Sequence, residues 1–335
     1  MVKKVLFATG ALAGLAASSL IRRRSCDFRG KTVFVSGGSR GLGLLLAKEF
    51  ASHGARVAIS ARDANELRRA EHQLRSISDQ VFTVEADVTI RTAAEDAVER
   101  VRQHFGPIDV LVNNAGTISV GPMEVATTDD FGNSINVHFW GPYFTTMAVL
   151  PDMQARRSGR IVNISSIGGK ISVPHLLAYS VGKFALTGFS EGLRSEVLKD
   201  GIYVTTVCPG LMRTGSPGNA LFKGKNRAEY AWFSISDALP LVSMSAERAA
   251  RRIVEACRRG QAELVLSIPA KLAVKFHGLF PGITADFLSI VNQVLPGPGG
   301  IGTQTRTGRE STSPVSPSWV TTLNERAAQR NNQIA

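Results

Sequence analysis

Tyr179 and Lys183 stand four residues apart in the segment 178–187. On a helix this spacing places both side chains on one face. A tyrosine hydroxyl ionises near pH ~10, so it works as an acid or base at neutrality only where a cation stabilises its phenolate. Lys183 is placed to be that cation, and the pair predicts an acid/base site. Taken alone, the same pair also fits a solvated helix face.

A glycine-rich segment lies near the start of the chain. Residues 32–36 are a short run typical of a strand, Gly37, Gly41 and Gly43 follow, and the next residues carry leucines at helical spacing. Glycines at such a turn let the backbone approach a pyrophosphate at the helix N-terminus. An ordinary tight turn uses glycines too, but the strand before and the helix after favour a dinucleotide site.

Further motifs follow in a fixed order. Asn-Asn-Ala-Gly occupies 113–116 after an apolar strand, Ile-Val-Asn-Ile-Ser-Ser-Ile occupies 161–167, and Pro209-Gly210 follows the Tyr-Lys pair. With these motifs, the chain from about residue 28 to 265 resembles the short-chain dehydrogenase/reductase family. Ser36 departs from the family's usual threonine, but either hydroxyl can hydrogen-bond the neighbouring loop.

This resemblance implies roles for four residues. Tyr179 would be the general acid/base, and Lys183 would lower its pKa and hydrogen-bond the nicotinamide ribose. The family's serine lies thirteen residues before the tyrosine, which selects Ser166 to hold the substrate oxygen and leaves Ser165 as the alternative. Asn136 matches the asparagine that supports a water-linked proton path, the alternative being a helix amide that satisfies local backbone.

The resemblance also implies the reaction. Hydride would pass between a nicotinamide and a carbonyl carbon while Tyr179 exchanges a proton with the carbonyl oxygen. Oxidation of an alcohol is the reverse path. The alternatives are a non-catalytic NADP(H)-binding scaffold and an epimerase or dehydratase on the same fold.

NADP(H) is the expected cofactor. Ala61 stands at the end of the second predicted strand, where an acidic side chain would bind the adenosine ribose and repel a phosphate. Arg62 follows it and Arg40 lies in the glycine loop, so two guanidinium groups could bind the 2′-phosphate. Asp63 argues for NAD if the loop shifts. The predicted cofactor-binding residues are Gly37, Ser39, Arg40, Gly41, Leu42, Gly43, Arg62, Asp87, Val88, Asn113, Ala115, Gly116, Tyr179, Lys183, Pro209, Gly210 and Thr214.

Composition and periodicity predict an α/β protein. The chain has 335 residues, 44% of them hydrophobic and 20% charged, enough for one large domain with a full core. Apolar runs alternate with helical patterns, which indicates a doubly wound parallel sheet, a Rossmann fold. We expect a single catalytic domain over 28–268, with a C-terminal extension. Strands are predicted at 32–36, 56–60, 81–85, 109–112, 160–164, 202–207 and 262–267.

Charge and cysteine usage exclude several classes. Residues 1–31 carry a net charge of +6 and residues 32–295 only +4, so the total of +12 gives no case for nucleic-acid binding. Anionic lipid near the N-terminal cluster is the better expectation. Three distant cysteines predict a reducing compartment without disulfides or zinc. The six histidines show no ligand spacing for a metal, and His138 and His175 either border the site or are structural.

The ends of the chain are expected to differ from the body. Residues 5–21 are uncharged and lie between basic clusters, which fits a short membrane anchor within an N-terminal segment 1–24 and a cytoplasmic catalytic domain. An export signal is disfavoured, and a packed apolar helix or a mis-assigned start is the alternative. Residues 269–295 predict an amphipathic extension facing a membrane or another subunit. Residues 296–335 read as a flexible polar tail with a short helix.

Residues 211–244 are the expected substrate lid, because the resemblance places specificity after Pro209-Gly210. Leu221, Phe222, Tyr230, Trp232 and Phe233 would give the lid an apolar inner face, or would simply pack it onto the body. The first interpretation predicts a small hydrophobic, lipid-like carbonyl or alcohol as substrate. The resemblance also implies a homodimer or homotetramer with the Tyr179 helix at a dimer face.

Overall fold

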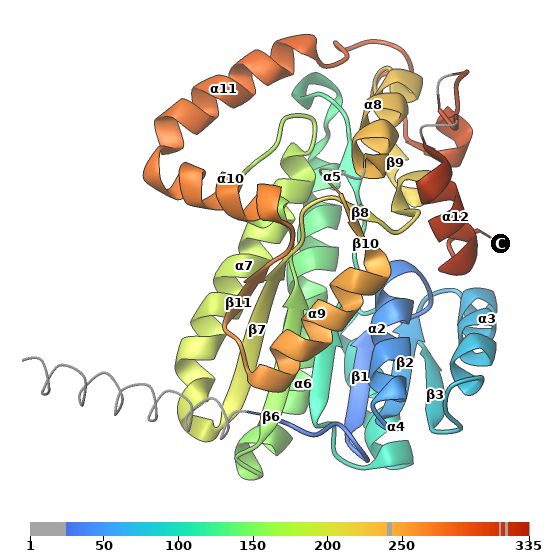
Figure 1. Cartoon of the computed structure of the whole chain (residues 1–335), viewed down its shortest axis with the longest axis vertical. Coiled ribbons are helices and arrows are strands. Elements are labelled where there is room, and N and C mark those ends of the chain that lie inside the picture. Colours follow the sequence, from blue (N-terminus) through green and yellow to red (C-terminus); the bar gives the residue numbers. More distant parts are fainter. Residues whose placement is uncertain (1–24, 240–242, 315, 319–320, 335) are drawn as a thin grey trace, which may run out of the picture.

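A seven-stranded parallel sheet forms the centre of the protein (Figure 1). The computed structural model describes residues 25–239, 243–314, 316–318 and 321–334. All seven predicted strands occur, and the doubly wound α/β fold is confirmed. In spatial order they are β11 (Glu263–Val265), β7 (Ile202–Cys208), β6 (Gly159–Ile164), β4 (Val110–Asn113), β1 (Thr32–Ser36), β2 (Arg56–Ala61) and β3 (Val81–Glu85).

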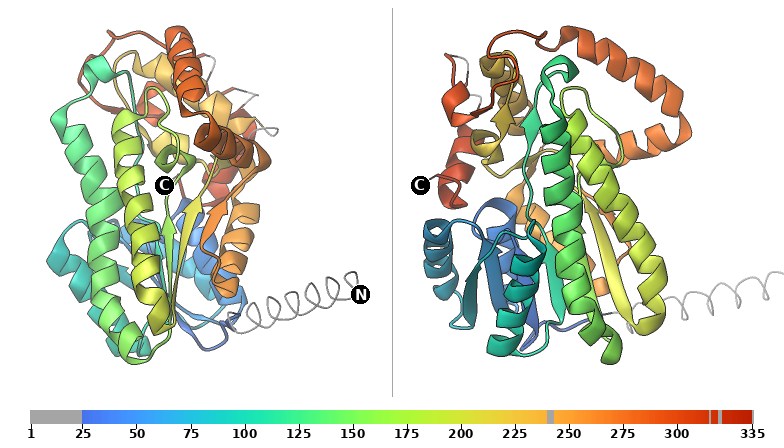
Figure 2. Two further views of the ribbon diagram at one scale, coloured as in Figure 1. Left: turned by 90° about the vertical axis from the view of Figure 1, so that its left-hand side faces the viewer. Right: turned by 180° about the vertical axis from the view of Figure 1, so that it is seen from behind.

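Helices cover both faces of this sheet (Figure 2). One apolar cluster joins the sheet to α2 (Gly41–Ser52), α3 (Ala64–Arg75) and α9 (Ala246–Arg259). A second cluster joins the other face to α4 (Arg91–Phe105), α6 (Gly141–Ala155) and α7 (Leu177–Val197). The near-continuous apolar strands are explained by burial on both faces.

The strand order reverses beside β1, and this brings the sequence motifs together. β1 pairs with β4 and β4 with β6, in a register that aligns Ser36 with Asn113 and Asn113 with Asn163. The glycine loop, the 113–116 segment and the serine segment therefore leave the sheet at one level. Ligands of open α/β sheets bind at such a switch point, beyond the carboxyl ends of the strands.

The predicted lid lies above this edge of the sheet. It contains β8 (Met212–Arg213), β9 (Leu221–Phe222), α8 (Asn226–Ala238) and β10 (Met244–Ser245). β9 pairs with β5 (Ser119–Val120) and β12 (Arg306–Thr307). Phe222 and Phe233 are buried in one cluster with Val120. These two aromatics pack the lid onto the body, which was the alternative to an apolar inner face.

Helices α10 (Ile268–Leu279) and α11 (Pro281–Val294) project from the body as an arch (Figure 1). Within the described part of the chain, no helix is both long and apolar enough to cross a bilayer. The predicted anchor, residues 5–21, lies outside the described residues. The large apolar side chains that the two helices expose are Ile268, Leu272, Phe276, Leu279, Phe280, Ile283, Phe287, Ile290 and Val294.

The C-terminal segment differs from the expected flexible tail. β12 joins the small sheet, and α12 (Thr322–Arg330) packs on Gly215, where an added Cβ would lie 2.5 Å from the Ala328 side chain. Figure 1 shows α12 above the upper ends of α2 and α3. Composition gave no sign of this packing because the amides of the segment bind backbone groups of the body, which no hydrophobic pattern reports.

Candidate active site

Helix α7 and strand β6 bring the predicted catalytic side chains together. The Lys183 Nζ donates to the Ile164 carbonyl at 2.8 Å, and the Lys183 side chain is buried. Ser166 follows β6 and hydrogen-bonds the Tyr179 hydroxyl. Its neighbour Ser165 donates to the Lys183 carbonyl at 3.1 Å and lies 2.7 Å from the Thr187 hydroxyl. Ser165 thus holds α7 in place, and Ser166 is the serine that faces the tyrosine.

Burial dominates the electrostatics of this group. Desolvation raises the pKa of Tyr179 to about 12, against the hydrogen bond with Ser166, which acts to lower it. Desolvation also lowers the pKa of Lys183 to about 7. The Lys183 Nζ lies 5.7 Å from the centre of the Tyr179 ring. Without a ligand, Tyr179 is therefore protonated at neutral pH, and the lowering of its pKa by Lys183 stays a prediction.

The structure places His138, and not Asn136, beside Tyr179. Asn136 begins a π-helical turn between α5 (Thr128–Ile135) and α6, and its side chain is exposed. His138 is 1% exposed, and its ring meets the Tyr179 ring edge-on with centroids 5.3 Å apart. The expectation that Asn136 reaches the catalytic group does not match this geometry. The π turn changes which side chains face inward, and matching Asn136 to the family's sequence motif cannot detect such a turn.

His138 is held as a neutral ring. Its Nε2 accepts from the Thr117 N–H at 3.3 Å, so its proton lies on Nδ1, 3.2 Å from the Ser134 hydroxyl. Burial lowers the pKa of His138 well below the usual range, and the charge of Lys183 acts in the same direction. Both ring nitrogens are satisfied, which orients the ring against Tyr179.

The glycine loop has the form that a dinucleotide site needs. Gly37 has φ +65°, and an added Cβ would lie 2.6 Å from the Ala115 Cα. At Gly43 an added Cβ would meet the Gly37 carbonyl. The Asn114 amide also donates to this carbonyl at 2.8 Å. The loop is thereby pressed against the 113–116 segment, and α2 begins directly after it at Gly41, where a helix N-terminus favours an anionic group.

Asn113 does not face this site, contrary to expectation. Its amide donates to Asn163 at 2.8 Å and to Thr146 at 3.1 Å, and its oxygen accepts from Thr145 at 2.6 Å. These contacts lie inside the sheet and under α6. Asn114 is the side chain that reaches the glycine loop, and the doubled Asn-Asn of the motif was the only sequence signal for it.

Each of the two predicted 2′-phosphate residues, Arg40 and Arg62, is paired with a carboxylate of this chain. Arg40 forms an ion pair with Glu66 at 2.7 Å, and the Ser39 hydroxyl donates to the same carboxylate at 2.9 Å. Arg62 is exposed and lies 3.7 Å from Asp87. Asp63 accepts from the Glu66 N–H at 2.9 Å as the N-cap of α3, and this hydrogen bond lowers its pKa. Its capping role weakens the argument that Asp63 selects NAD.

Other predicted cofactor residues lie in the segments that follow the carboxyl ends of β4 and β7. The Pro209 carbonyl accepts from Ile167 at 2.7 Å, which ties the Pro-Gly turn to the serine segment. Thr214 is buried, and its hydroxyl accepts from Ser216. Gly116 leaves room for His138, with an added Cβ only 3.3 Å from Nε2. Leu42 and Val88 are buried.

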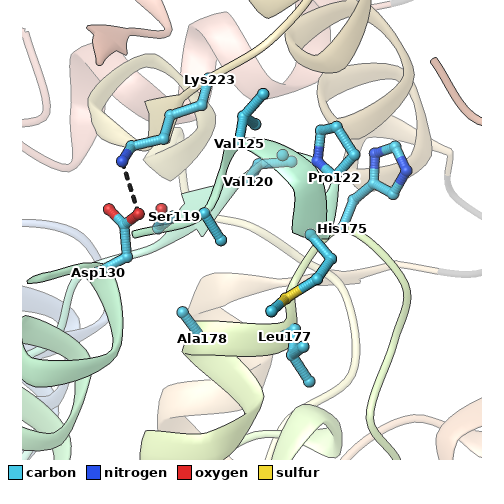
Figure 3. Close-up of a pocket in the computed structure, with 12 residues that line it drawn as sticks. Ser119, Val120, Pro122, Val125, Asp130, His175, Leu177, Ala178 and Lys223 are labelled. Carbon is cyan, nitrogen blue, oxygen red and sulfur yellow. Dashed lines mark hydrogen bonds and ion pairs between the residues drawn. The ribbon is translucent and has the colours of Figure 1, made fainter. Parts of the chain in front are cut away.

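Two small cavities lie near Tyr179, and Ser119 and Asp130 line both. The inner cavity reaches Tyr179, Ser134 and Leu221. Figure 3 shows the outer cavity, where Asp130 and Lys223 form an ion pair at 2.6 Å. Most of its wall is apolar, from Val120, Pro122, Met123, Val125, Ala126, Leu177 and Ala178.

Within the described residues, no group of three or more histidine, cysteine or acidic side chains could hold a metal ion. Cys26, Cys208 and Cys257 are free thiols.

Comparison with known proteins decides the family. The model of the short chain dehydrogenase family matches residues 31–221. The chain belongs to this family. A dehydrogenase/reductase SDR family protein 7-like of Anopheles gambiae is 34% identical over 83% of this chain and 89% of its own length. A 3-dehydrosphinganine reductase of Danio rerio is 36% identical over 61% of this chain and 62% of its own.

Solved structures of this short-chain dehydrogenase family agree. A short-chain dehydrogenase from Streptomyces avermitilis has a TM-score of 0.68 at 31% identity and covers 78% of this chain and 97% of its own. L-Sorbose reductase from Gluconobacter frateurii, complexed with NADPH and L-sorbose, has a TM-score of 0.63 at 28% identity, with coverages of 72% and 97%. The family is one of oxidoreductases that bind a nicotinamide cofactor, and the tight turn that Gly37 and Gly43 permit before α2 is of the kind such a group needs.

The contrast between His138 and Asn136 gives a first prediction. His138→Leu leaves the Thr117 N–H and the Ser134 hydroxyl without their ring partner, so the free energy of unfolding should fall by about 1–3 kcal/mol, and turnover should fall because the Tyr179 ring loses its support. Asn136→Ala should change neither. Urea unfolding and steady-state kinetics on both variants check this. Loss of turnover in Asn136→Ala alone would return the role to the asparagine.

Proposed function

We propose that the chain interconverts a carbonyl and an alcohol with NADP(H), using Tyr179 as the general acid/base. The observation that carries this proposal is the meeting of Ser166, Tyr179 and Lys183 beside a cavity at the switch point of the sheet. NADPH supplies the hydride when it is bound. A catalytic domain facing the cytoplasm remains part of the proposal.

Each side chain has a distinct task in this scheme. Tyr179 is protonated at neutral pH, so it can donate its proton to the oxygen of a carbonyl that is being reduced. The Ser166 hydroxyl hydrogen-bonds the same oxygen. Lys183, with a pKa of about 7, gains positive charge readily as a phenolate forms next to it. The coupled pair thus moves the proton without leaving an uncompensated charge in a buried site.

The outer cavity supports a hydrophobic substrate with a polar reactive end. The carbonyl would lie against Tyr179 in the inner cavity, and an apolar chain would extend along Val120, Met123 and Leu177. The similarity to a 3-dehydrosphinganine reductase supports a lipid-like ketone. The lid aromatics do not contribute to this argument, because Phe222 and Phe233 are packed into the body.

Tyr179→Phe tests the mechanism. Removing the hydroxyl should lower kcat with a long-chain ketone by about 10²- to 10³-fold, as loss of one donor to a developing oxyanion typically does. The Kd for NADPH should stay unchanged, and Tyr143→Phe on α6 is the matched control. Absorbance of the reduced nicotinamide measures both. Full turnover in Tyr179→Phe would remove the mechanism, and cofactor binding without turnover of any ketone would favour the scaffold.

The cofactor assignment makes a separate prediction. Arg40→Ala and Arg62→Ala should each weaken NADPH binding by about tenfold, the effect of losing one charge-assisted hydrogen bond at a partly exposed site, and should leave NADH binding little changed. Arg68→Ala is the control, because this exposed guanidinium contacts Asn65 on its own helix. Fluorescence titration with both dinucleotides checks it, and an equal loss for NADPH and NADH would contradict the 2′-phosphate role.

We also propose that the exposed face of α10 and α11 contacts an anionic lipid surface. The face is apolar, and Lys271 and Lys275 add positive charge to the first of its two helices. Both helices project from the body (Figure 2). A second subunit on the same face is the competing occupant.

Vesicle sedimentation with a chain lacking residues 1–24 tests the lipid contact. Phe287→Ser with Ile290→Ser removes two side chains that are each 61% exposed, and should lower partitioning onto anionic vesicles about tenfold or more. Ile90→Ser, at an exposed position outside the arch, should change nothing. Absence of vesicle binding, with a dimer that the double variant dissociates, would assign the face to a second copy.

A further inference from the structure

Asn331, Asn332 and Gln333 lie buried on the glycine loop, directly after α12. They are 1%, 4% and 7% exposed, although all three side chains are polar amides. The Asn331 carbonyl accepts from the Gly41 N–H at 2.8 Å, and the Asn332 amide donates to the Ser39 carbonyl at 2.8 Å. These three residues, called the tail clamp below, therefore bind the loop that is expected to hold the dinucleotide.

Other contacts of the tail clamp go to the remaining walls of the same site. The Asn331 amide donates to the Thr214 carbonyl at 3.4 Å. The Asn332 amide also donates to the Glu66 carbonyl at 3.1 Å, and its oxygen accepts from Arg69 at 2.8 Å. Ser39, Gly41 and Thr214 are all predicted cofactor-binding residues. The clamp thus joins the loop, α3 and the lid across the place where a dinucleotide would lie.

The contacts also match a dinucleotide in chemistry. Gly41 begins α2, and a helix N-terminus favours an anionic oxygen on its N–H groups. The Asn331 carbonyl oxygen now accepts from that group. The Glu66 carboxylate, whose backbone the clamp holds, accepts from Ser39 and is paired with Arg40. The Asn331 carbonyl and the Glu66 carboxylate therefore occupy the N–H and O–H donors to which pyrophosphate and 2′-phosphate oxygens would bind.

Gln333 fixes the clamp in position. Its side chain accepts from the Asn219 amide at 2.6 Å, its backbone carbonyl accepts from Arg309, and its N–H donates to the Ala328 carbonyl at 2.9 Å. An added Cβ at Gly41 would overlap the Gln333 amide nitrogen. A bound phosphate and the clamp could not both lie against Gly41.

We propose that residues 331–333 are an autoinhibitory clamp that competes with the nicotinamide dinucleotide for the glycine loop. Binding of the cofactor displaces the clamp, and the fraction of molecules with a released clamp sets the apparent affinity. This inference rests on the proposed NADP(H) binding. It adds that the chain regulates its own cofactor site through the segment after α12.

Fluorescence titration with NADPH tests the competition, on the full chain and on a chain ending at Arg330. The shortened chain should bind NADPH about tenfold more tightly, the change expected where the clamp leaves about a tenth of the molecules open. Equal or weaker binding by the shortened chain would overturn the clamp alone. Binding of neither NADPH nor NADH by either chain would overturn the proposed function together with the clamp.

A point variant guards against misfolding of the shortened chain. Asn332→Ala removes three hydrogen bonds of the clamp and should tighten NADPH binding in the same direction. Gln329→Ala, which truncates an exposed amide on α12, should leave the Kd at its original value. Tightening in both variants alike, or in neither, would contradict the clamp.

Hydrogen exchange on the full chain provides a readout without catalysis. The backbone N–H of Gln333 donates to the Ala328 carbonyl, so its hydrogen should exchange slowly in the free protein and faster after NADPH is added. Slower exchange on adding NADPH would show a strap that closes over the cofactor, and would overturn displacement.

Discussion

The close packing of α7 between β6 and the α5–α6 junction positions everything else in the site. An added Cβ at Gly182 would lie 2.5 Å from the Ser134 hydroxyl, and one at Gly169 would lie 2.6 Å from the Lys183 carbonyl. Contacts this close leave α7 one position along its axis. Two hydrogen bonds also join α7 to the end of β6: Ser165 donates to the Lys183 carbonyl, and the Lys183 Nζ donates to the Ile164 carbonyl. The packing of α7 consequently places Tyr179 between Ser166 and His138.

A buried polar network extends this constraint into the sheet. Asn163 donates to Ser190 of α7 at 3.0 Å, and Thr206 of β7 donates to the same hydroxyl at 2.7 Å. Asn113 joins the network through Asn163. Buried polar groups are costly unless every one has a partner, so the network specifies one alignment of β4, β6, β7 and α7. Asn113 acts in this alignment, which explains its place in the motif without a contact to cofactor.

The sequence predicts the strands, their parallel order and the proximity of Tyr179 and Lys183 because these depend on local patterns. Strand periodicity and a four-residue helix spacing survive any tertiary arrangement. Asn136 and Asn113 were predicted to face the site and do not, because side-chain direction there depends on a π turn and on cross-strand hydrogen bonds. The packed tail was missed for a related reason, since amide contacts with distant backbone leave no periodic signal.

Three donors at the glycine loop already have acceptors in the free protein, so a cofactor that uses them must displace those acceptors. Gly41, Ser39 and Arg40 each have an acceptor from this chain, because a half-buried donor without one costs about 1–3 kcal/mol. A cofactor would therefore replace acceptors of this chain with its own phosphate oxygens. Its affinity then depends on the difference in free energy between the hydrogen bonds that it forms and those that it breaks. The charge on phosphate oxygens is the term that favours the cofactor in this exchange, since charge-assisted hydrogen bonds are about twice as strong as neutral ones. The uncharged Asn331 carbonyl is the weaker acceptor on Gly41, whereas Glu66 already offers Arg40 a full negative charge, so the pyrophosphate side of the site should open more readily than the 2′-phosphate side.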